Sequence, residues 1–208
     1  MLNIHITENH GGKMEGMASV SSNRRCNGRC LENAKIPGSI CAVCYAEKLM
    51  KLRKNLANCL TRNYNILTRD IYPVTEMPII NRAFFRIESF GDVGNWIHAA
   101  NYIRLIQRNP YTNFGWWTKN PDFLEEAFDR LGEGKPKNVQ ILLSSLFIDE
   151  PVKNHFWFVD KTFTVHSKES VKEGKVIINC QKTPDRKCIN CLKCYLPNDI
   201  KEIHEEVK

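Results

Sequence analysis

The cysteines of this 208-residue chain are concentrated at its two ends. Eight of the nine form two groups of four: Cys26, Cys30, Cys41 and Cys44, then Cys180, Cys188, Cys191 and Cys194, with only Cys59 apart. Clustered cysteines with CxxC spacing are typical of metal or redox sites in reducing compartments, where disulfides are rare. The grouping therefore predicts an intracellular metalloprotein with a cysteine site near each end, and not a disulfide framework.

The composition fits a globular domain of moderate size. Hydrophobic residues make up 42% and charged residues 25% of the chain, so a sizeable core is expected. No apolar run approaches the roughly 18 residues that span a bilayer, and the N-terminus lacks a signal-peptide pattern. We therefore expect a cytoplasmic protein with no membrane partner. The net charge of +7, with many basic residues before residue 70, fits a nucleic-acid or anionic-cofactor partner or a solvated helix face.

Strand and helix patterns alternate through the middle of the chain. Leucines at helical spacing predict a helix over residues 45–69, which is ended by the prolines that follow. Strands are predicted at 83–89, 113–119, 138–145, 161–167 and 175–180, helices at 95–109 and 121–131, and a strand or two before residue 22. This alternation indicates parallel strands with helical crossovers, so we predict an α/β fold, a partial (β/α) barrel of about six mainly parallel strands.

The first cysteine group lies in a loop at residues 23–45, between a predicted strand and the first long helix. In an α/β barrel this is the carboxyl-end face of the strands, where active sites lie. The neighbouring Arg24, Arg25 and Arg29 favour the thiolate form. Four thiolates suit Zn²⁺ or an iron–sulfur cluster, whereas three leave a [4Fe–4S] cluster with one open iron. The position in the fold favours the iron–sulfur interpretation.

The second cysteine group lies in a separate segment, residues 180–208, which follows the partial barrel of residues 1–179. Cys188, Cys191 and Cys194 have the CxxCxxC spacing of iron–sulfur ligands, and Cys180 supplies a fourth thiolate upstream. Four thiolates make a closed site, which suits electron transfer or structural support. We favour a second [4Fe–4S] cluster over zinc, and cysteines from both ends could also share one site.

Four segments, IPGSICAVCYAEKL, FFRIESFGDVGNWI, YTNFGWWTKNPDFLEEA and NVQILLSS, in this order resemble phage-associated radical-SAM-like families. One is a phage tail-region family with an SPGCxxCYA-type motif. The other is the mycobacteriophage gene product eighty-eight family, which also carries a cysteine cluster like CQKTPDRKCINCLKC. The likeness runs from about Cys26 to Cys194. It implies a radical-SAM-like partial barrel, in which three cysteines hold a [4Fe–4S] cluster and S-adenosylmethionine binds the open iron.

The resemblance also implies roles for particular residues. Cys30, Cys41 and Cys44 form the best three-cysteine set, although ten residues separate the first two and Cys26 is additional. The other cofactor-binding candidates follow strand ends: Glu88, Ser89, Asp92, Lys119 and Ser144. The first three would meet the methionine ammonium, the lysine a carboxylate or a substrate anion, and Ser144 the ribose or substrate. Weaker candidates for the same site are one of the two neighbours Trp116 and Trp117, which lie on opposite faces of one strand, and His166.

These observations leave three functions open. The first is a radical-SAM-type enzyme, with a reductant such as flavodoxin or ferredoxin as partner and nucleic acid or protein as the substrate class. The alternative is a metal-stabilised nucleic-acid-binding or accessory protein without catalysis, which would use the basic helix between Lys48 and Arg69. The third is an electron-transfer protein with two closed clusters. The state of Cys26 separates them, because a fourth thiolate would close the first site.

Overall fold

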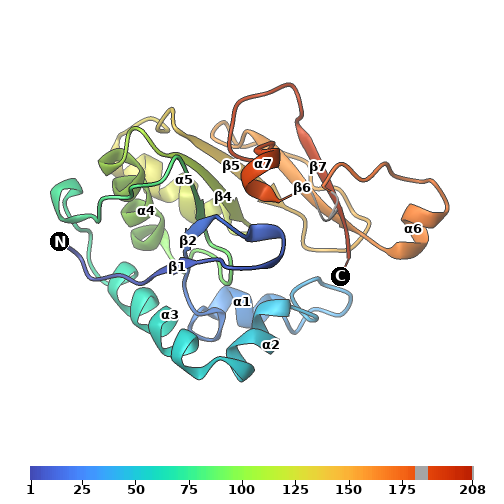
Figure 1. Cartoon of the computed structure of the whole chain (residues 1–208), viewed down its shortest axis with the longest axis horizontal. Helices are drawn as coiled ribbons and strands as arrows, with labels where there is room; N and C mark the ends of the chain where they lie inside the picture. Colours follow the sequence, from blue (N-terminus) through green and yellow to red (C-terminus); the bar gives the residue numbers. More distant parts are fainter. Residues whose placement is uncertain (181–186, 208) are drawn as a thin grey trace.

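The computed structural model describes residues 1–180 and 187–207 as an α/β fold with an open seven-stranded sheet (Figure 1). The strands follow one another in chain order across the sheet; β1 and β2 run antiparallel, and every later neighbouring pair is parallel. They are β1 (Ile6–Glu8), β2 (Ala18–Val20), β3 (Phe84–Ile87), β4 (Asn113–Thr118), β5 (Val139–Ser144), β6 (Lys161–His166) and β7 (Glu202–Glu206). Residues 181–186, within the C-terminal cysteine segment, and Lys208 lie outside the described residues.

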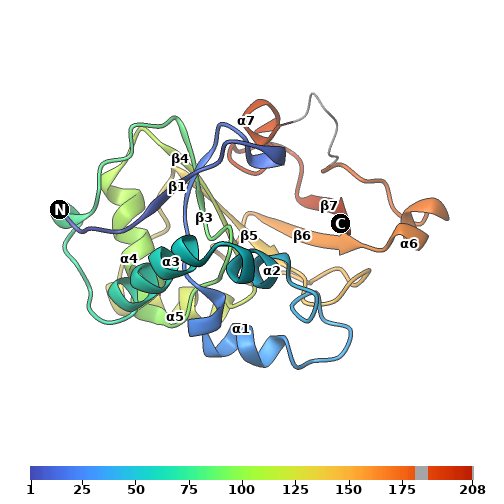
Figure 2. The same cartoon turned by 60° about the horizontal axis from the view of Figure 1, so that its bottom comes forward.

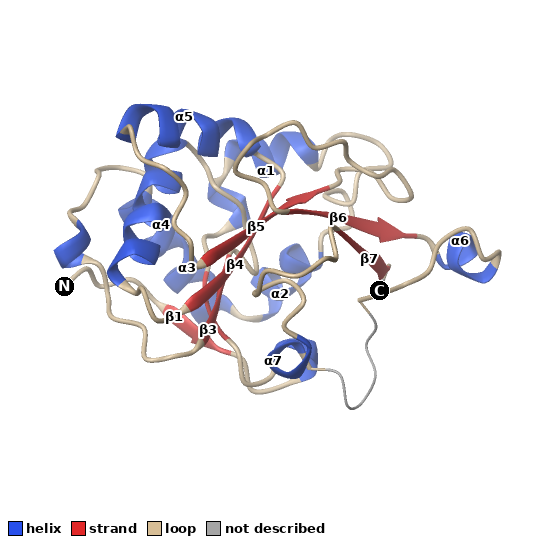
Figure 3. Ribbon diagram, turned by 90° about the horizontal axis from the view of Figure 1, so that it is seen from above, coloured by secondary structure: helices blue, strands red, loops and turns tan. Residues whose placement is uncertain are grey.

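The helices form the crossovers between the first parallel strands. They are α1 (Gly28–Asn33), α2 (Tyr45–Leu52), α3 (Lys54–Leu67), α4 (Trp96–Arg108), α5 (Pro121–Leu131), α6 (Lys168–Lys172) and α7 (Cys188–Cys191), with 3-10 turns η1 (Gly12–Met14), η2 (Arg24–Cys26) and η3 (Val74–Glu76). Figure 3 shows α4 and α5 together on one side of the strands. Among the described helices, none has the length and apolar character needed to cross a lipid bilayer.

The core lies between the sheet and the helices α3, α4 and α5. Alternate residues of the central strands face this side, and Phe85, Ile87 and Trp116 are fully buried there. Trp116 meets Tyr102 of α4 edge to face, with 5.5 Å between the ring centroids. Burying a side chain such as Phe85 stabilises the fold by about 1.5–3 kcal/mol, so these contacts fix the sheet against the helices.

The other face of the sheet carries the residues between those core positions. Arg86 of β3 is paired in register with Ser19 of β2 and with Gly115 of β4, and Trp117 lies two residues farther along β4. Successive side chains of a strand point to opposite faces, so these four residues lie on the face away from α4 and α5. In Figure 2, α1 and α2 lie on the lower side of the view and α7 on the upper side, with the strands between them.

Most of the predicted elements are present, with two corrections. The α/β alternation is confirmed. Asn95 is the N-cap of α4, and Pro121 lies in the first turn of α5. The helix predicted over 45–69 is divided at Arg53 into α2 and α3. The strand predicted over 175–180 is wrong, because that segment is irregular and β7 pairs with β6 instead. The apolar residues Val176, Ile177 and Ile178 favour a strand, but the edge of the sheet next to β6 is occupied by β7.

Candidate functional site

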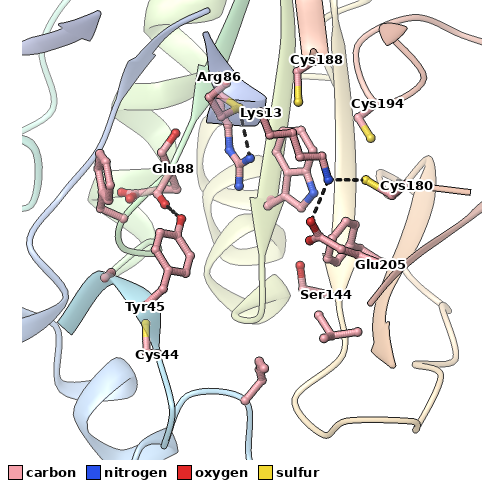
Figure 4. Close-up of a pocket in the computed structure, with 18 of the residues that line it drawn as sticks. Lys13, Cys44, Tyr45, Arg86, Glu88, Ser144, Cys180, Cys188, Cys194 and Glu205 are labelled. Carbon is pink, nitrogen blue, oxygen red and sulfur yellow. Dashed lines mark hydrogen bonds and ion pairs between the residues drawn. The ribbon is translucent and has the colours of Figure 1, made fainter. Parts of the chain in front are cut away.

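A cavity of about 1170 Å³ is lined by cysteines from both ends of the chain, and we call it the chamber. Its cysteines are Cys30, Cys41 and Cys44 of the N-terminal loop and Cys180, Cys188, Cys191 and Cys194 of the C-terminal segment. Figure 4 shows Cys44 on one side and Cys180, Cys188 and Cys194 on the other. The volume exceeds the roughly 300–1,000 Å³ of typical small-molecule sites, so the chamber has room for more than one group.

The N-terminal cysteine loop is fixed to the ends of the parallel strands. Asn27 caps α1 by accepting from the Cys30 amide at 3.4 Å, and its side-chain amide donates to the carbonyls of Asp92 and Val93 after β3. Farther along, the Ile40 amide donates to the carbonyl of Leu146, just after β5, at 2.9 Å. These bonds hold the loop at the carboxyl ends of β3 and β5, where α/β folds bind their ligands.

Cys26 is separated from the other three cysteines of its group. Its thiol lies 3.7 Å from the Thr61 hydroxyl of α3. Among the described residues, those that line the chamber include Cys30, Cys41 and Cys44 but not Cys26. The structure therefore brings three cysteines of the first group to the chamber and turns the fourth toward a helix.

Burial sets the chemistry of the chamber thiols. It raises the pKa of Cys30, an effect that the nearby carboxylates of Asp92 and Glu88 increase. Burial also raises the pKa of Cys41, although Lys119 acts in the opposite direction. Thiolates at these positions need a compensating positive centre, which a bound metal supplies. Within the described residues, no group of three His, Cys, Asp or Glu side chains is close enough to bind a single metal ion. The thiolates of a [4Fe–4S] cluster bind different irons, so they lie farther apart than the ligands of one ion.

Glu88 occupies the end of β3 with its carboxylate held by protein donors. It is 2% exposed and accepts from the Ser22 amide at 3.1 Å, the Ser22 hydroxyl at 2.8 Å and the Tyr102 hydroxyl at 2.8 Å. A Cβ on Gly91 would lie 2.6 Å from the Ser22 carbonyl oxygen, so only glycine fits beside this carboxylate. The predicted ammonium acceptor thus borders the chamber while its oxygens bind the β2 end and α4.

Glu88 and His98 form a buried titratable pair. Burial raises the pKa of Glu88 to about 7, and the hydrogen bonds from Tyr102 and Ser22 only partly oppose this effect. Burial lowers the pKa of His98 to about 3, so its ring is neutral. The His98 Nδ1 atom accepts from the Gly94 amide at 3.2 Å, which leaves the proton on Nε2, 3.6 Å from the Glu88 carboxylate. The Glu88 carboxyl therefore keeps its proton to a higher pH than an exposed glutamate does.

This burial predicts a pH-dependent stability that Glu88→Gln removes. The folded chain holds the Glu88 proton more tightly than the unfolded chain, whose pKa is near 4.5, so this stabilisation is present below pH 4.5 and lost up to about pH 7. The loss amounts to about 3 kcal/mol at most. His98 titrates in the opposite sense, so the wild-type minus variant difference in urea unfolding free energy, at about pH 5 and about pH 8, isolates Glu88. Exposed Glu125→Gln should leave the wild-type pH dependence intact, and a Glu88→Gln variant that also retains it would contradict this assignment.

Asp92 ties the end of β3 to the end of β4. Its buried carboxylate accepts from the Thr118 hydroxyl at 2.7 Å, the Lys119 amide at 2.7 Å and the Val93 amide at 2.8 Å. Burial raises the pKa of Asp92 while these donors lower it. The Asp92 carboxylate therefore links the ends of β3 and β4 by hydrogen bonds, and these bonds position Lys119 at the chamber wall.

The remaining predicted polar residues also border the chamber. Ser89 and Ser144 both line it. The Ser89 hydroxyl is buried and, among the described residues, has no hydrogen-bond partner. The Ser89 carbonyl accepts from the Tyr45 hydroxyl, which links α2 to the strand end. Every cofactor-binding candidate named from the sequence therefore borders one cavity, and their roles there stay predictions.

The C-terminal cysteine segment is packed against the open face of the sheet. Tyr195 is 2% exposed and meets the Trp117 ring edge to face at 5.7 Å between centroids. Gly115 of β4 allows this approach, because a Cβ there would lie 2.9 Å from the Tyr195 ring and 3.0 Å from the Cys194 carbonyl oxygen. Cys180 accepts from the Lys13 ammonium at 2.7 Å, and Lys13 also pairs with Glu205 at 2.7 Å. Burial and neighbouring thiolates raise the pKa of Cys194.

Sequence reasoning missed three residues of the chamber, Lys13, Arg86 and Glu205. Lys13 and Glu205 come from opposite ends of the chain, and their pairing has no local sequence signal. Arg86 did have one, since a charge inside the apolar strand FFRI faces a cavity or a partner if the strand is covered on both sides. A charged residue in a buried strand is therefore a usable marker of such a cavity.

Two weaker candidates are placed differently from each other. Trp117 lines the chamber, whereas Trp116 lies in the core, as expected for neighbours on one strand. His166 faces a second cavity, where its Nδ1 lies 3.2 Å from the Asp149 carboxylate and its Nε2 lies 2.9 Å from His204. His166 thus belongs to the β6–β7 edge and not to the cysteine chamber.

Comparison with known proteins gives no significant match to a protein family, to a curated protein or to a solved structure.

Proposed function

We propose that this protein is a radical-SAM-type iron–sulfur enzyme that reductively cleaves S-adenosylmethionine to modify a substrate. The observation that carries the proposal is the separation of the first cysteine group. Cys30, Cys41 and Cys44 border the chamber, whereas the Cys26 thiol contacts Thr61. Three thiolates leave one iron of a [4Fe–4S] cluster open for a ligand, as in the families that the sequence resembles.

The donor set of the chamber fits this cofactor. The partly buried thiols of Cys30, Cys41 and Cys44 line the chamber, and burial raises the pKa of Cys30 and Cys41, so these two need a cationic centre to bind as thiolates. Cys30, Cys41 and Cys44 would hold this cluster, which would supply an electron for the reductive cleavage of S-adenosylmethionine. The four C-terminal cysteines fit a second, closed cluster on the same chamber.

The chain's own residues would bind and orient the reacting groups. Asp92 and Thr118 fix two strand ends, so that Lys119 is held at the wall as a cation for a carboxylate. The unpartnered Ser89 hydroxyl and Ser144 supply neutral hydrogen bonds at neighbouring strand ends. Arg24, only 7% exposed in its side chain, pairs with Glu47 at 2.9 Å and fastens the cysteine loop to α2. Such fixed donors position a ligand without reorganisation during the reaction.

The test is reductive cleavage of S-adenosylmethionine. Anaerobically reconstituted wild-type protein with dithionite should form 5′-deoxyadenosine and methionine, measured by chromatography, and Cys44→Ala should form neither. Exposed Lys51→Ala is the matched control on the adjoining helix and should cleave at the wild-type rate. A wild-type protein with a full complement of iron and sulfide that yields no 5′-deoxyadenosine refutes the proposal. Salt-dependent binding of DNA or RNA without cleavage would favour the non-catalytic alternative instead.

A further inference from the structure

Arg86 is a cation of the chamber wall that forms no ion pair within 4.0 Å among the described residues, although the more distant Glu205 acts to raise its pKa. It lies in the middle of β3, lines the chamber, and projects into it in Figure 4. Its guanidinium stacks on the Trp117 ring, 4.0 Å from the ring centroid. Its Nε atom is buried and has no hydrogen-bond partner in the described part of the chain. A buried guanidinium nitrogen without a partner costs free energy unless a ligand binds it.

Two other cations that line the chamber, Lys13 and Arg24, already have carboxylate partners. Lys13 pairs with Glu205 at 2.7 Å, and Arg24 pairs with Glu47 at 2.9 Å. Within residues 1–180 and 187–207, no carboxylate oxygen lies within 4.0 Å of the Arg86 guanidinium, whose one hydrogen-bond contact is the Met14 sulfur at 3.6 Å. Thioether sulfur is a weak acceptor, so this contact does not satisfy the charge. The positive charge of Arg86 is therefore available to a ligand.

Arg86 forms no hydrogen bond with a cysteine sulfur among the described residues, although its charge opposes the rise that burial causes in the pKa of Cys188 and Cys194. Lys13 shows how a cation binds a thiol here, since its ammonium donates to Cys180 at 2.7 Å. Arg86, by contrast, donates to no cysteine sulfur among the described residues, and Trp117 holds its guanidinium plane from one face. A stacked guanidinium keeps its edge free, and that edge presents parallel N–H groups suited to two oxygens of one oxyanion.

Two neighbouring hydroxyls are buried and also lack partners. Ser19 faces Arg86 in register on β2, is 0% exposed, and its hydroxyl has no partner among the described residues. The Tyr195 hydroxyl, on the segment that covers the same face, is likewise buried without one. Unsatisfied buried donors are rare in native proteins, and two of these three groups, Arg86 and Tyr195, belong to residues that line the chamber, which favours a polar ligand there.

We propose that Arg86, stacked on Trp117, binds an oxyanion of the substrate, a carboxylate or phosphate, in the chamber between the two cysteine groups. The assignment of this oxyanion to the substrate rests on the proposed function, in which Lys119 at the strand ends binds the carboxylate of S-adenosylmethionine. The site therefore selects an anionic substrate and binds its charged end at Arg86, on the face of the sheet away from α4 and α5. The reacting end then points toward the carboxyl ends of the strands, where Cys30, Cys41 and Cys44 lie.

The test measures binding of inorganic phosphate and, separately, of S-adenosylmethionine to reconstituted protein by calorimetry. Arg86→Gln should weaken phosphate binding by about 10- to 100-fold, the range for a charge-assisted hydrogen bond, and leave S-adenosylmethionine binding unchanged. Arg86→Lys keeps the positive charge but not the two parallel N–H groups of the guanidinium, so its phosphate affinity should lie between those of wild type and Arg86→Gln. Arg82→Gln is the matched control, because Arg82 is exposed on the same segment and pairs with Glu8. Circular dichroism establishes that each variant is folded.

Three outcomes overturn the inference. Phosphate binding that is equal in wild type and folded Arg86→Lys and Arg86→Gln, or absent from all three, removes the oxyanion site. Loss of S-adenosylmethionine binding in Arg86→Gln assigns the anion to the cofactor instead of the substrate. A shifted reduction potential without a change in phosphate binding makes Arg86 a counter-charge for a cluster. If Arg86-dependent phosphate binding is present but 5′-deoxyadenosine never forms, the proposed function fails and the oxyanion site stands.

Discussion

Replacing Cys30, Cys41 or Cys44 by alanine, one at a time, is expected to remove about four irons per chain, the content of one [4Fe–4S] cluster. Each of these cysteines borders the chamber, and none has a spare thiol beside it, because Cys26 contacts Thr61 of α3. A cubane held by three thiolates does not survive on two when the open iron has no protein ligand. The measurement is iron and sulfide content after anaerobic reconstitution, with the electron paramagnetic resonance spectrum of the reduced protein.

Cys26→Ala is the informative companion to these variants. It should keep the iron content of the wild type, because the Cys26 thiol is turned away from the chamber. Cys59→Ala, on the same helix as Thr61, controls for the loss of a thiol outside the chamber. If Cys26→Ala also loses about four irons, the first site is closed by four thiolates, and the case for a ligand-binding iron is removed.

The central part of the fold could be predicted because its signals are local. The apolar strands at Phe84–Ile87 and Val139–Ser144 and the amphipathic helix Pro121–Leu131 each carry their own periodicity. The ends of the chain were harder. Glu202–Glu206 is charged along its length and has no strand pattern, yet it pairs with β6 because the sheet offers an open edge. Tertiary pairing there outweighs the intrinsic preference of the residues.

Part of the membership of the candidate site was predictable, but its geometry was not. Asp92, Lys119 and Ser144 were named because the resemblance implies roles for residues at these strand ends, and all three line the chamber. That Cys44 and Cys194 border the same cavity depends on contacts between distant segments, which no spacing rule encodes. The sequence also does not determine whether the Glu88 carboxylate points into the chamber or toward other side chains. The Glu88 carboxylate binds Ser22 and Tyr102, and this follows from burial and from the turn at Gly91.

Gly115→Val is expected to detach the C-terminal cysteine segment from the sheet. A Cβ at Gly115 would lie 2.9 Å from the rings of Trp117 and Tyr195 and 3.0 Å from the Cys194 carbonyl oxygen, and valine adds two methyl groups to it. Overpacking of this kind costs about 1–3 kcal/mol. Because the displaced backbone carries Cys194, we also expect loss of about four irons from the second site, while the first site keeps its own. Iron content and urea unfolding measure the two effects.

Whether Gly115→Val lowers or raises the free energy of unfolding distinguishes a strand that is covered at Gly115 from one that is not. Valine favours strands and glycine weakens them, so Gly115→Val would stabilise β4 if nothing lay over Gly115. Gly134→Val is the control, since a Cβ at Gly134 meets no atom within 4 Å. Gly115→Ala should give a smaller loss than valine, because it lacks the branched methyl groups. A stabilised Gly115→Val protein with full iron would show that Cys194 and Tyr195 do not rest on this strand, and that the two cysteine groups do not share the chamber.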